Sequence, residues 1–220
     1  MKIAESWLTQ VPCLDTPDLT YVQHVSRGIL DRIAADRNLL TTLVDEVLQN
    51  PDRLAASRVT LLLNRLSLWE APDRSFELRL NMNPRPENQL VPHDHCYAFA
   101  THILAGGYVH VVRRRTDGWK GSFTGADLQP AIVTVERPGS TYALDHSMVH
   151  QAVMAPDTVT LFIRGPRRKQ RSHAADELMP SRQSWPEPAV PGDEPAESRS
   201  ATLEEFLIMR RYLRDRRIIN

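Results

Sequence analysis

Short β-type runs that alternate with turn residues fill the middle of the chain and constrain its fold more than any other feature. Between Val59 and Gly165 the runs of β-branched and aliphatic residues are VTLLLNRLSLW, SFELRLNM, YAFATHIL, YVHVVRR, AIVTVE, STYALD, MVHQAV and TVTLFIRG. Pro, Gly and Asp separate them about every ten residues, and no helical pattern lies between them. This spacing predicts an antiparallel sandwich or barrel, so we expect a mainly β protein.

Helical patterns precede the β region. Apolar residues recur at helical spacing from Thr16 to Leu66, which predicts two helices and a shorter third. Asp18 or Thr16 is the expected cap of the first helix, and Asn50-Pro51 is expected to end the second.

A last helix is expected at the end of the chain, where Thr202 and Glu205 form a capping-box pattern before an amphipathic stretch. The stretch before it is rich in Pro, Glu, Arg and Ser and too poor in aliphatic residues to form a core. The expected organisation is a helical segment packing on the barrel (1–58), a barrel with the functional site (59–166), a Pro-rich arm or linker (167–200) and a C-terminal helix (201–220).

Charge and composition exclude several partners. The 220 residues include 27 Lys and Arg and 27 Asp and Glu, so no bulk field favours nucleic acid or an anionic membrane. No apolar run approaches the roughly 20 residues that span a bilayer, and Cys13 and Cys96 form no disulfide framework. We expect a cytoplasmic protein with a small-molecule substrate. Because the last helix can dock on its own domain or on a second subunit, a homodimer stays open.

Two histidine clusters indicate a metal site. His93 and His95 are one residue apart, so in a strand they share a face about 6 to 7 Å apart along the backbone. Two imidazoles at this spacing can converge on one ion at about 2.0 to 2.2 Å. A third ligand must come from elsewhere, and the stretch LDHSMVHQAV offers His146 and His150 on another expected strand.

The same stretches resemble the two motifs of the cupin superfamily, small jelly-roll (double-stranded β-helix) barrels that carry a metal inside. They are VPHDH followed by an apolar strand and AGGY, and PGSTYALDHSMVHQAV. The general first motif has a glutamate four or five residues after its second histidine, where this chain has Phe99 and Ala100. The resemblance covers about residues 59 to 166 and implies a metal-binding barrel that lacks the carboxylate ligand.

Loss of the glutamate resembles the thiol dioxygenases, cysteine dioxygenase and its relatives, whose iron is held by three histidines. Gly139, Asp145, Ser147 and His150 follow their second motif with one residue fewer, so the resemblance implies His150 as the third ligand. Two features of that family are missing. The cysteine of its crosslink corresponds to Ala100, and the histidine and tyrosine of its Ser-His-Tyr relay would lie near Gly165 and Arg167.

Other polar and aromatic residues are candidates for the surroundings of the metal. His146 is a candidate acid or base at the pocket mouth, and Asp94 either fixes an imidazole or is solvated. Arginine binds carboxylates with a two-pronged fork, and Arg79 is the candidate anchor, with Arg65 and Arg164 as alternatives. Residues of the same parity as the ligands can line the pocket, namely Tyr97, Phe99 and Thr101. No role is expected for His102 or His110, whose default is an outward or second-layer imidazole, and Cys96 is expected on the face opposite the ligands.

Three functions are open on these residues. The first is a mononuclear non-haem Fe(II) oxygenase that uses O2 on a small thiol, amino acid or amine-bearing metabolite. The second is a non-oxidative cupin isomerase, lyase or hydrolase using Zn, Mn or Ni, and the third is a non-catalytic ligand-binding or metal-storage cupin. The missing relay makes a more specialised metabolite a better candidate substrate than cysteine.

Overall fold

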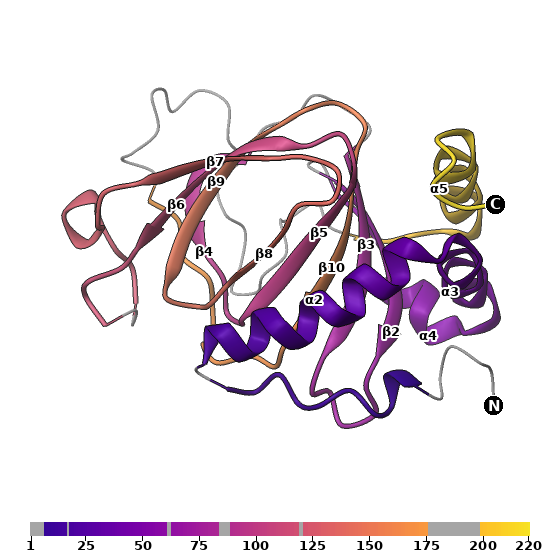
Figure 1. Ribbon diagram of the computed structural model, residues 1–220, viewed down its shortest axis with the longest axis horizontal. Coiled ribbons are helices and arrows are strands. Elements are labelled where there is room, and N and C mark those ends of the chain that lie inside the picture. Colours follow the sequence, from indigo (N-terminus) through magenta and orange to yellow (C-terminus); the bar gives the residue numbers. More distant parts are fainter. Residues whose placement is uncertain (1–6, 17, 61–62, 84–88, 119–120, 176–198) are drawn as a thin grey trace.

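A computed structural model describes residues 7–16, 18–60, 63–83, 89–118, 121–175 and 199–220, and Figure 1 shows two facing sheets with helices against one of them. Sheet A has seven strands in the order β11-β1-β2-β3-β10-β5-β8. Their bounds are β1 Arg58–Val59, β2 Asn64–Glu70, β3 Glu77–Asn83, β5 Phe99–Ala105, β8 Thr141–Leu144, β10 Thr158–Arg164 and β11 Arg199–Ser200. Sheet B has the order β4-β9-β6-β7. Its strands are β4 Gln89–Asp94, β6 Tyr108–Arg114, β7 Ile132–Glu136 and β9 Met148–Met154.

The strand order defines a jelly roll. Strands β3 to β10 contribute four members to each sheet, β3-β10-β5-β8 in sheet A and β4-β9-β6-β7 in sheet B. The pairs within these two sets are antiparallel. Eight strands distributed in this way over two sheets form the double-sheet barrel of the jelly-roll class. The expected mainly β barrel with flanking helices is therefore confirmed.

The helices begin and end largely where the sequence predicts. Helix α2 (Leu19–Ala35) is capped by Asp18, whose carboxylate accepts the backbone N–H groups of Thr20 and Tyr21. Helix α3 (Arg37–Gln49) ends at Asn50, which caps α4 (Pro51–Ala56). The capping box of Thr202 and Glu205 is present at the start of α5 (Leu203–Asp215). These caps use backbone N–H groups that have no partner inside the helix.

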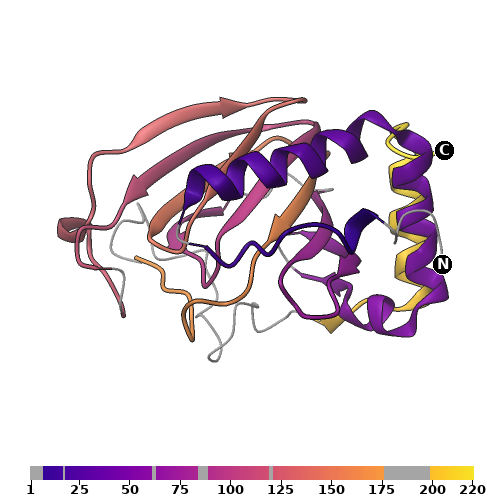
Figure 2. The same ribbon diagram turned by 60° about the horizontal axis from the view of Figure 1, so that its bottom comes forward.

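The helical layer covers the outer face of sheet A. Figure 2 shows α2 lying along the sheet and α5 beside α3, where Arg210 Nε is 2.6 Å from Asp45 Oδ1. Because side chains alternate along a strand, one face of sheet A presents aliphatic residues to these helices. They include Leu66, Leu68, Leu78, Leu80, Met82, Ala100, Leu161 and Ile163, all members of the largest core cluster. The chain's main apolar core thus lies outside the barrel.

The hairpin between β5 and β6 depends on two glycines. Gly106 and Gly107 have φ values of 68° and 142°, a region that favours glycine. A Cβ on Gly107 would lie 2.2 Å from the carbonyl oxygen of Glu136. The glycine pair therefore lets the end of β7, which carries Glu136, approach the start of β6.

The rest of the expected organisation falls partly beyond the described residues. Of the expected arm at 167–200, residues 176–198 lie outside them, whereas Arg199–Ser200 pairs with β1 as β11. Among the described helices, none is long and apolar enough to cross a membrane.

Candidate metal centre

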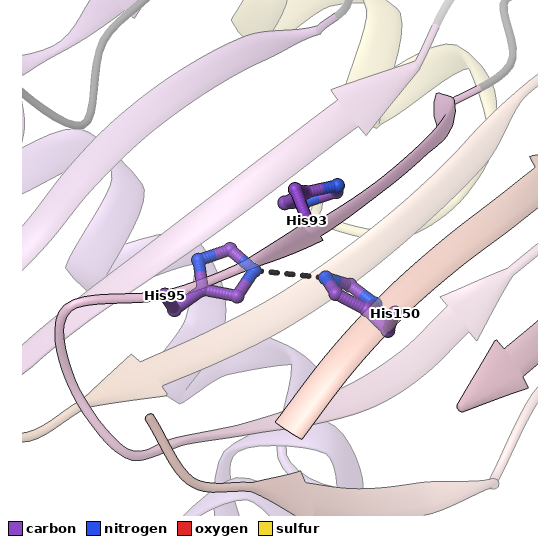
Figure 3. A group of neighbouring side chains, drawn as sticks. All are labelled: His93, His95 and His150. Atoms are coloured by element: carbon purple, nitrogen blue, oxygen red, sulfur yellow. Dashed lines mark hydrogen bonds between the residues drawn. The ribbon is translucent and has the colours of Figure 1, made fainter. Parts of the chain in front are cut away.

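Three histidines converge between the two sheets (Figure 3). His93 comes from β4, His95 directly follows this strand, and His150 comes from β9. Strand pairing places His93 opposite His150. One ring nitrogen from each of the three lies within 4.8 Å of the others, and the Nε2 atoms of His95 and His150 are 2.8 Å apart. Within the described part of the chain, this is the group of side chains that can hold a metal ion.

Hydrogen bonds orient two of the rings. His93 Nδ1 lies 2.8 Å from the carbonyl oxygen of Val91, so this nitrogen carries the proton and donates. That tautomer leaves Nε2 of His93 with a lone pair. Nδ1 of His150 lies 2.8 Å from Nε2 of His110. Metal-binding histidines are usually fixed in this manner through their second nitrogen.

The spacing of the nitrogens fits a divalent ion. Two ligands at about 2.1 Å from a metal and at right angles are about 3.0 Å apart, close to the separation of His95 and His150. The three donors are neutral imidazole nitrogens, which suit Fe, Zn, Cu or Ni. The residues therefore fit a mononuclear transition-metal site with three protein ligands.

Burial keeps the three imidazoles neutral. Desolvation lowers the pKa of His93 and lowers the pKa of His95 and His150 well below the ordinary value of 6.5. Neighbouring imidazoles add to this effect, since a positive charge on one disfavours a charge on the next. A metal ion needs the neutral form, so the site is in a binding-competent protonation state at neutral pH.

Phe99 takes the position from which a carboxylate ligand could act. Its ring centroid lies 4.6 Å from that of His95 and 5.8 Å from that of His150. Ala100, the alternative position, belongs to the core cluster on the outer face of sheet A. Strand parity therefore separates the two candidates, and the residue beside the histidines is aromatic.

A cluster of charged side chains lies on the inner face of sheet A. Glu77 is buried and accepts from Arg79 Nε at 2.6 Å, Arg79 Nη2 at 2.7 Å and Arg164 Nε at 2.8 Å. Burial raises the pKa of Glu77, but the arginines outweigh it and the net shift is downward. The guanidinium of Arg164 lies 4.8 Å above the ring of Tyr97. The guanidinium of Arg79, expected to bind a substrate carboxylate, binds the carboxylate of Glu77.

Three cationic side chains contribute to the low pKa of His95, and two of them, Arg79 and Lys169, are paired with Glu77 and Asp94. After burial and His93, the charges of Lys169, Arg65 and Arg79 each contribute to lowering the pKa of His95. The side chain of Lys169 is 7% exposed and that of Arg79 is 12% exposed, so water screens these charges poorly.

Asp94, between the two ligands, holds another part of the chain in place. It is fully buried, and its Oδ2 lies 2.6 Å from both Arg115 Nη1 and Lys169 Nζ. Its Oδ1 accepts the backbone N–H of His173 at 2.8 Å. Neither expected role, fixing a ligand imidazole or being solvated, is what the structure shows. Asp94 instead holds residues 169–175 alongside β4, where Ala174 forms an antiparallel β-bridge with His93.

The other residues expected at the site differ in how they lie relative to the three histidines. His146 lies in the turn between β8 and β9, not on a strand, and is outside the three-histidine group. Thr101 is buried beside its cross-strand partner Tyr142. The chain bends at 95–98, so the expected alternation through Cys96 is wrong, and Cys96 packs with Tyr97 and Phe99.

A buried polar wall, formed by Tyr108, His110 and Tyr142, lies on the other side of His150. The sequence alone assigns it no role. His110 is 1% exposed and contacts His150, and burial lowers its pKa to about 4. The hydroxyls of Tyr108 and Tyr142 form a hydrogen bond, and burial raises the pKa of Tyr142 to about 12. The parity of His110 in its strand was readable, but the pairing of β6 with β9 that brings it to His150 was not.

A shallow groove of about 360 Å³ lies elsewhere, lined by Trp7, Val11, Val25, Ile29 and Arg32 among others. It is formed by the first described residues and α2, on the outer side of sheet A. The histidines lie on the inner side, so the groove is separate from the candidate metal centre.

Comparisons with known proteins find distant structural likenesses alone. No family model matches the chain, and no curated protein matches it in sequence. Among solved structures, KdgF from Halomonas sp. is 19% identical, with a TM-score of 0.36, over 50% of this chain and 85% of that one. An RmlC-like cupin from Shewanella frigidimarina NCIMB 400 is 17% identical, with a TM-score of 0.36, over 50% and 82%. An oxalate oxidase is 12% identical, with a TM-score of 0.37, over 52% and 53%. These likenesses are distant, so the fold class depends on the strand order itself.

Proposed function

We propose that the protein is a mononuclear, cupin-type oxygenase in which His93, His95 and His150 hold one Fe(II) and O2 is the co-substrate. The observation that carries this proposal is the convergence of three neutral imidazoles inside a jelly roll. The aromatic Phe99 in the carboxylate position supports it further. Iron, when bound, supplies the redox chemistry by which O2 oxidises an organic molecule.

The protein's own residues define what can be oxidised. Three neutral ligands leave the charge of a divalent ion uncompensated, which favours an anionic substrate, such as a small carboxylate bearing a thiol or an amine. Arg65 adds a positive charge near His95, whereas Arg79 is paired with Glu77 and Lys169 with Asp94. Glu77, held by Arg79 and Arg164, is the acidic group on this face that can meet an ammonium group.

Aromatic side chains pack beside His95 on the inner face of sheet A. Phe99 stacks on Phe162 with ring centroids 5.0 Å apart, and Tyr97 lies edge-on to both rings. Exclusion of water strengthens the attraction between a bound anion and the surrounding charges. Tyr97, Phe99 and Thr101 remain the proposed lining of the substrate pocket, and His146 the proposed acid or base at its mouth.

Oxygen consumption tests the proposal. Protein purified without O2 and loaded with Fe(II) should consume O2 when mixed with one member of a panel of thiols, amino acids and related carboxylates. His93→Ala should abolish this uptake, whereas His24→Ala, which removes an exposed imidazole of α2, should leave it unchanged.

The two other functions give different outcomes. A protein that binds a divalent metal and converts a substrate without consuming O2 is a non-oxidative enzyme using Zn, Mn or Ni. A protein that retains no metal, and whose ligand binding survives His93→Ala, is a non-catalytic cupin. Either result would overturn the oxygenase proposal.

A further inference from the structure

His150 differs from the other two candidate ligands in what holds it. Nδ1 of His93 is fixed by a backbone carbonyl, but Nδ1 of His150 contacts the side chain of His110. On the far side of His110, Nδ1 lies 3.9 Å from Glu136 Oε1. The three residues come from neighbouring strands of sheet B, since β6 pairs with both β9 and β7. A buried row of side chains therefore runs from the site towards a carboxylate, whose distance from His110 is longer than a hydrogen bond.

The row has two alternative directions of hydrogen bonding. The contact His150–His110 holds one proton when both imidazoles are neutral. In one direction every N–H points towards Glu136. In the other, a lone pair of His110 faces the carboxylate of Glu136, which is unfavourable. The negative charge of Glu136 thus favours the direction in which Nδ1 of His150 donates to His110.

The surroundings make this selection effective. His110 is 1% exposed and the side chain of Glu136 is 11% exposed, so the electrostatic preference is little screened. Thr134 Oγ1 donates to Glu136 Oε1 at 2.6 Å and holds the carboxylate. The rings of Tyr108 and Tyr142, with centroids 5.7 and 4.5 Å from that of His110, restrict its rotation.

We propose that His110 and Glu136 are positioning residues that hold His150 in the Nδ1–H tautomer before any metal arrives, so that its Nε2 is already an acceptor. The inference rests on the proposed function, because it takes His150 as a metal ligand. It also identifies a carboxylate that can act in place of the absent glutamate ligand. Phe99 supplies no negative charge next to the metal, and Glu136 supplies one two side chains away, through His110 and His150. Outer partners of this kind typically change metal affinity about 10- to 100-fold.

Tautomers measured by ¹⁵N NMR on the full chain test the inference, with Zn(II) as a diamagnetic probe. In metal-free protein His150 should carry its proton on Nδ1. Adding Zn(II) should leave the tautomer of His150 unchanged. A metal-free His150 with its proton on Nε2 overturns the inference.

Zn(II) affinity of three variants supplies a second measurement. His110→Phe should weaken binding about 10- to 100-fold, whereas His110→Gln should recover most of the loss, because its amide oxygen can accept from His150 Nδ1. Tyr108→Phe, which removes a hydrogen bond from the same wall without touching His150, should change affinity less than about twofold. Equal affinity of His110→Phe and wild type overturns the inference alone. Wild-type protein that binds no Zn(II) overturns the proposed function as well.

Discussion

The two faces of sheet A divide the molecule between stability and chemistry. On the outer face, side chains such as Leu80 and Leu161 pack against the helices and form the largest apolar cluster. On the inner face, one residue away in each strand, lie Arg79, Phe99 and Arg164, facing the three histidines across the barrel. The largest apolar cluster therefore lies outside the barrel, and the interior combines smaller apolar clusters with charged groups.

The difference teaches that residue parity, more than position along the chain, decides what a residue of this barrel does. Neighbours such as Phe99 and Ala100 belong to different layers. A substitution on the outer face should therefore change stability, whereas a substitution on the inner face should change metal binding.

The largest expected effect follows from placing a carboxylate on either side of the sheet. Ala100→Glu should lower the free energy of unfolding by at least about 4 kcal/mol, because the side chain enters an apolar core without a partner. Phe99→Glu places the same group beside His95, where Zn(II) should restore the lost stability. Denaturation with and without Zn(II) measures both effects. Equal rescue of the two variants would contradict the assignment of faces.

Removing the charge that holds residues 169–175 should have the next largest effect. Asp94→Asn leaves Lys169 buried without this carboxylate, while Arg115 keeps its contacts with Asp117, and the loss should cost about 3 to 5 kcal/mol of stability. The double variant with Lys169→Met should recover part of the loss, since one uncompensated charge disappears. Denaturation of the single and double variants measures the coupling, and strictly additive losses would show that the two charges do not interact.

A cavity on the outer face should affect stability alone. Leu80→Ala should lower the free energy of unfolding by about 3 kcal/mol, because the side chain is fully buried among Leu66 and Leu161. Its Zn(II) affinity should match that of wild type. A loss of affinity comparable to that of His110→Phe would show that the two faces are coupled.

The free energy of unfolding should decrease gradually as the pH falls, because of the buried histidines on the inner side of the barrel. The pKa values of His95 and His150 lie well below 6.5 in the folded protein, and that of His110 is about 4, so below pH 6.5 the unfolded chain binds more protons. Stability is therefore full above pH 6.5 and falls as the pH decreases, by about 1.4 kcal/mol per pH unit for each such group. For His110 the window runs from 6.5 to about 4. Denaturation of metal-free protein at several pH values tests this, and a flat profile would contradict it.

Much of the fold was predictable because it depends on local sequence patterns, namely turns, helix caps and strand alternation. Evenly spaced turns predict the strands, and caps such as Asp18 and the pair Thr202 and Glu205 mark the helix ends. Alternation places Arg79 opposite Leu78 and Leu80, as the structure shows. These signals depend on residues close together in the sequence.

Features that depend on long-range pairing or on bends were not predictable. The meeting of His110 with His150 needs the register of β6 against β9, which no local pattern fixes. The bend at 95–98 interrupts the strand alternation that would place Cys96 opposite the ligands. The partners of Asp94 lie 21 and 75 residues away, at Arg115 and Lys169, so its role as an anchor was not visible in the sequence.

Metal content tests the central claim most directly. Protein purified without O2 and reconstituted with Fe(II) should contain one ion per chain, and His93→Ala, His95→Ala and His150→Ala should each lose most of it. The control His24→Ala should keep full occupancy. Full occupancy in all three ligand variants, with the fold intact, would contradict the assignment of these histidines as the metal site.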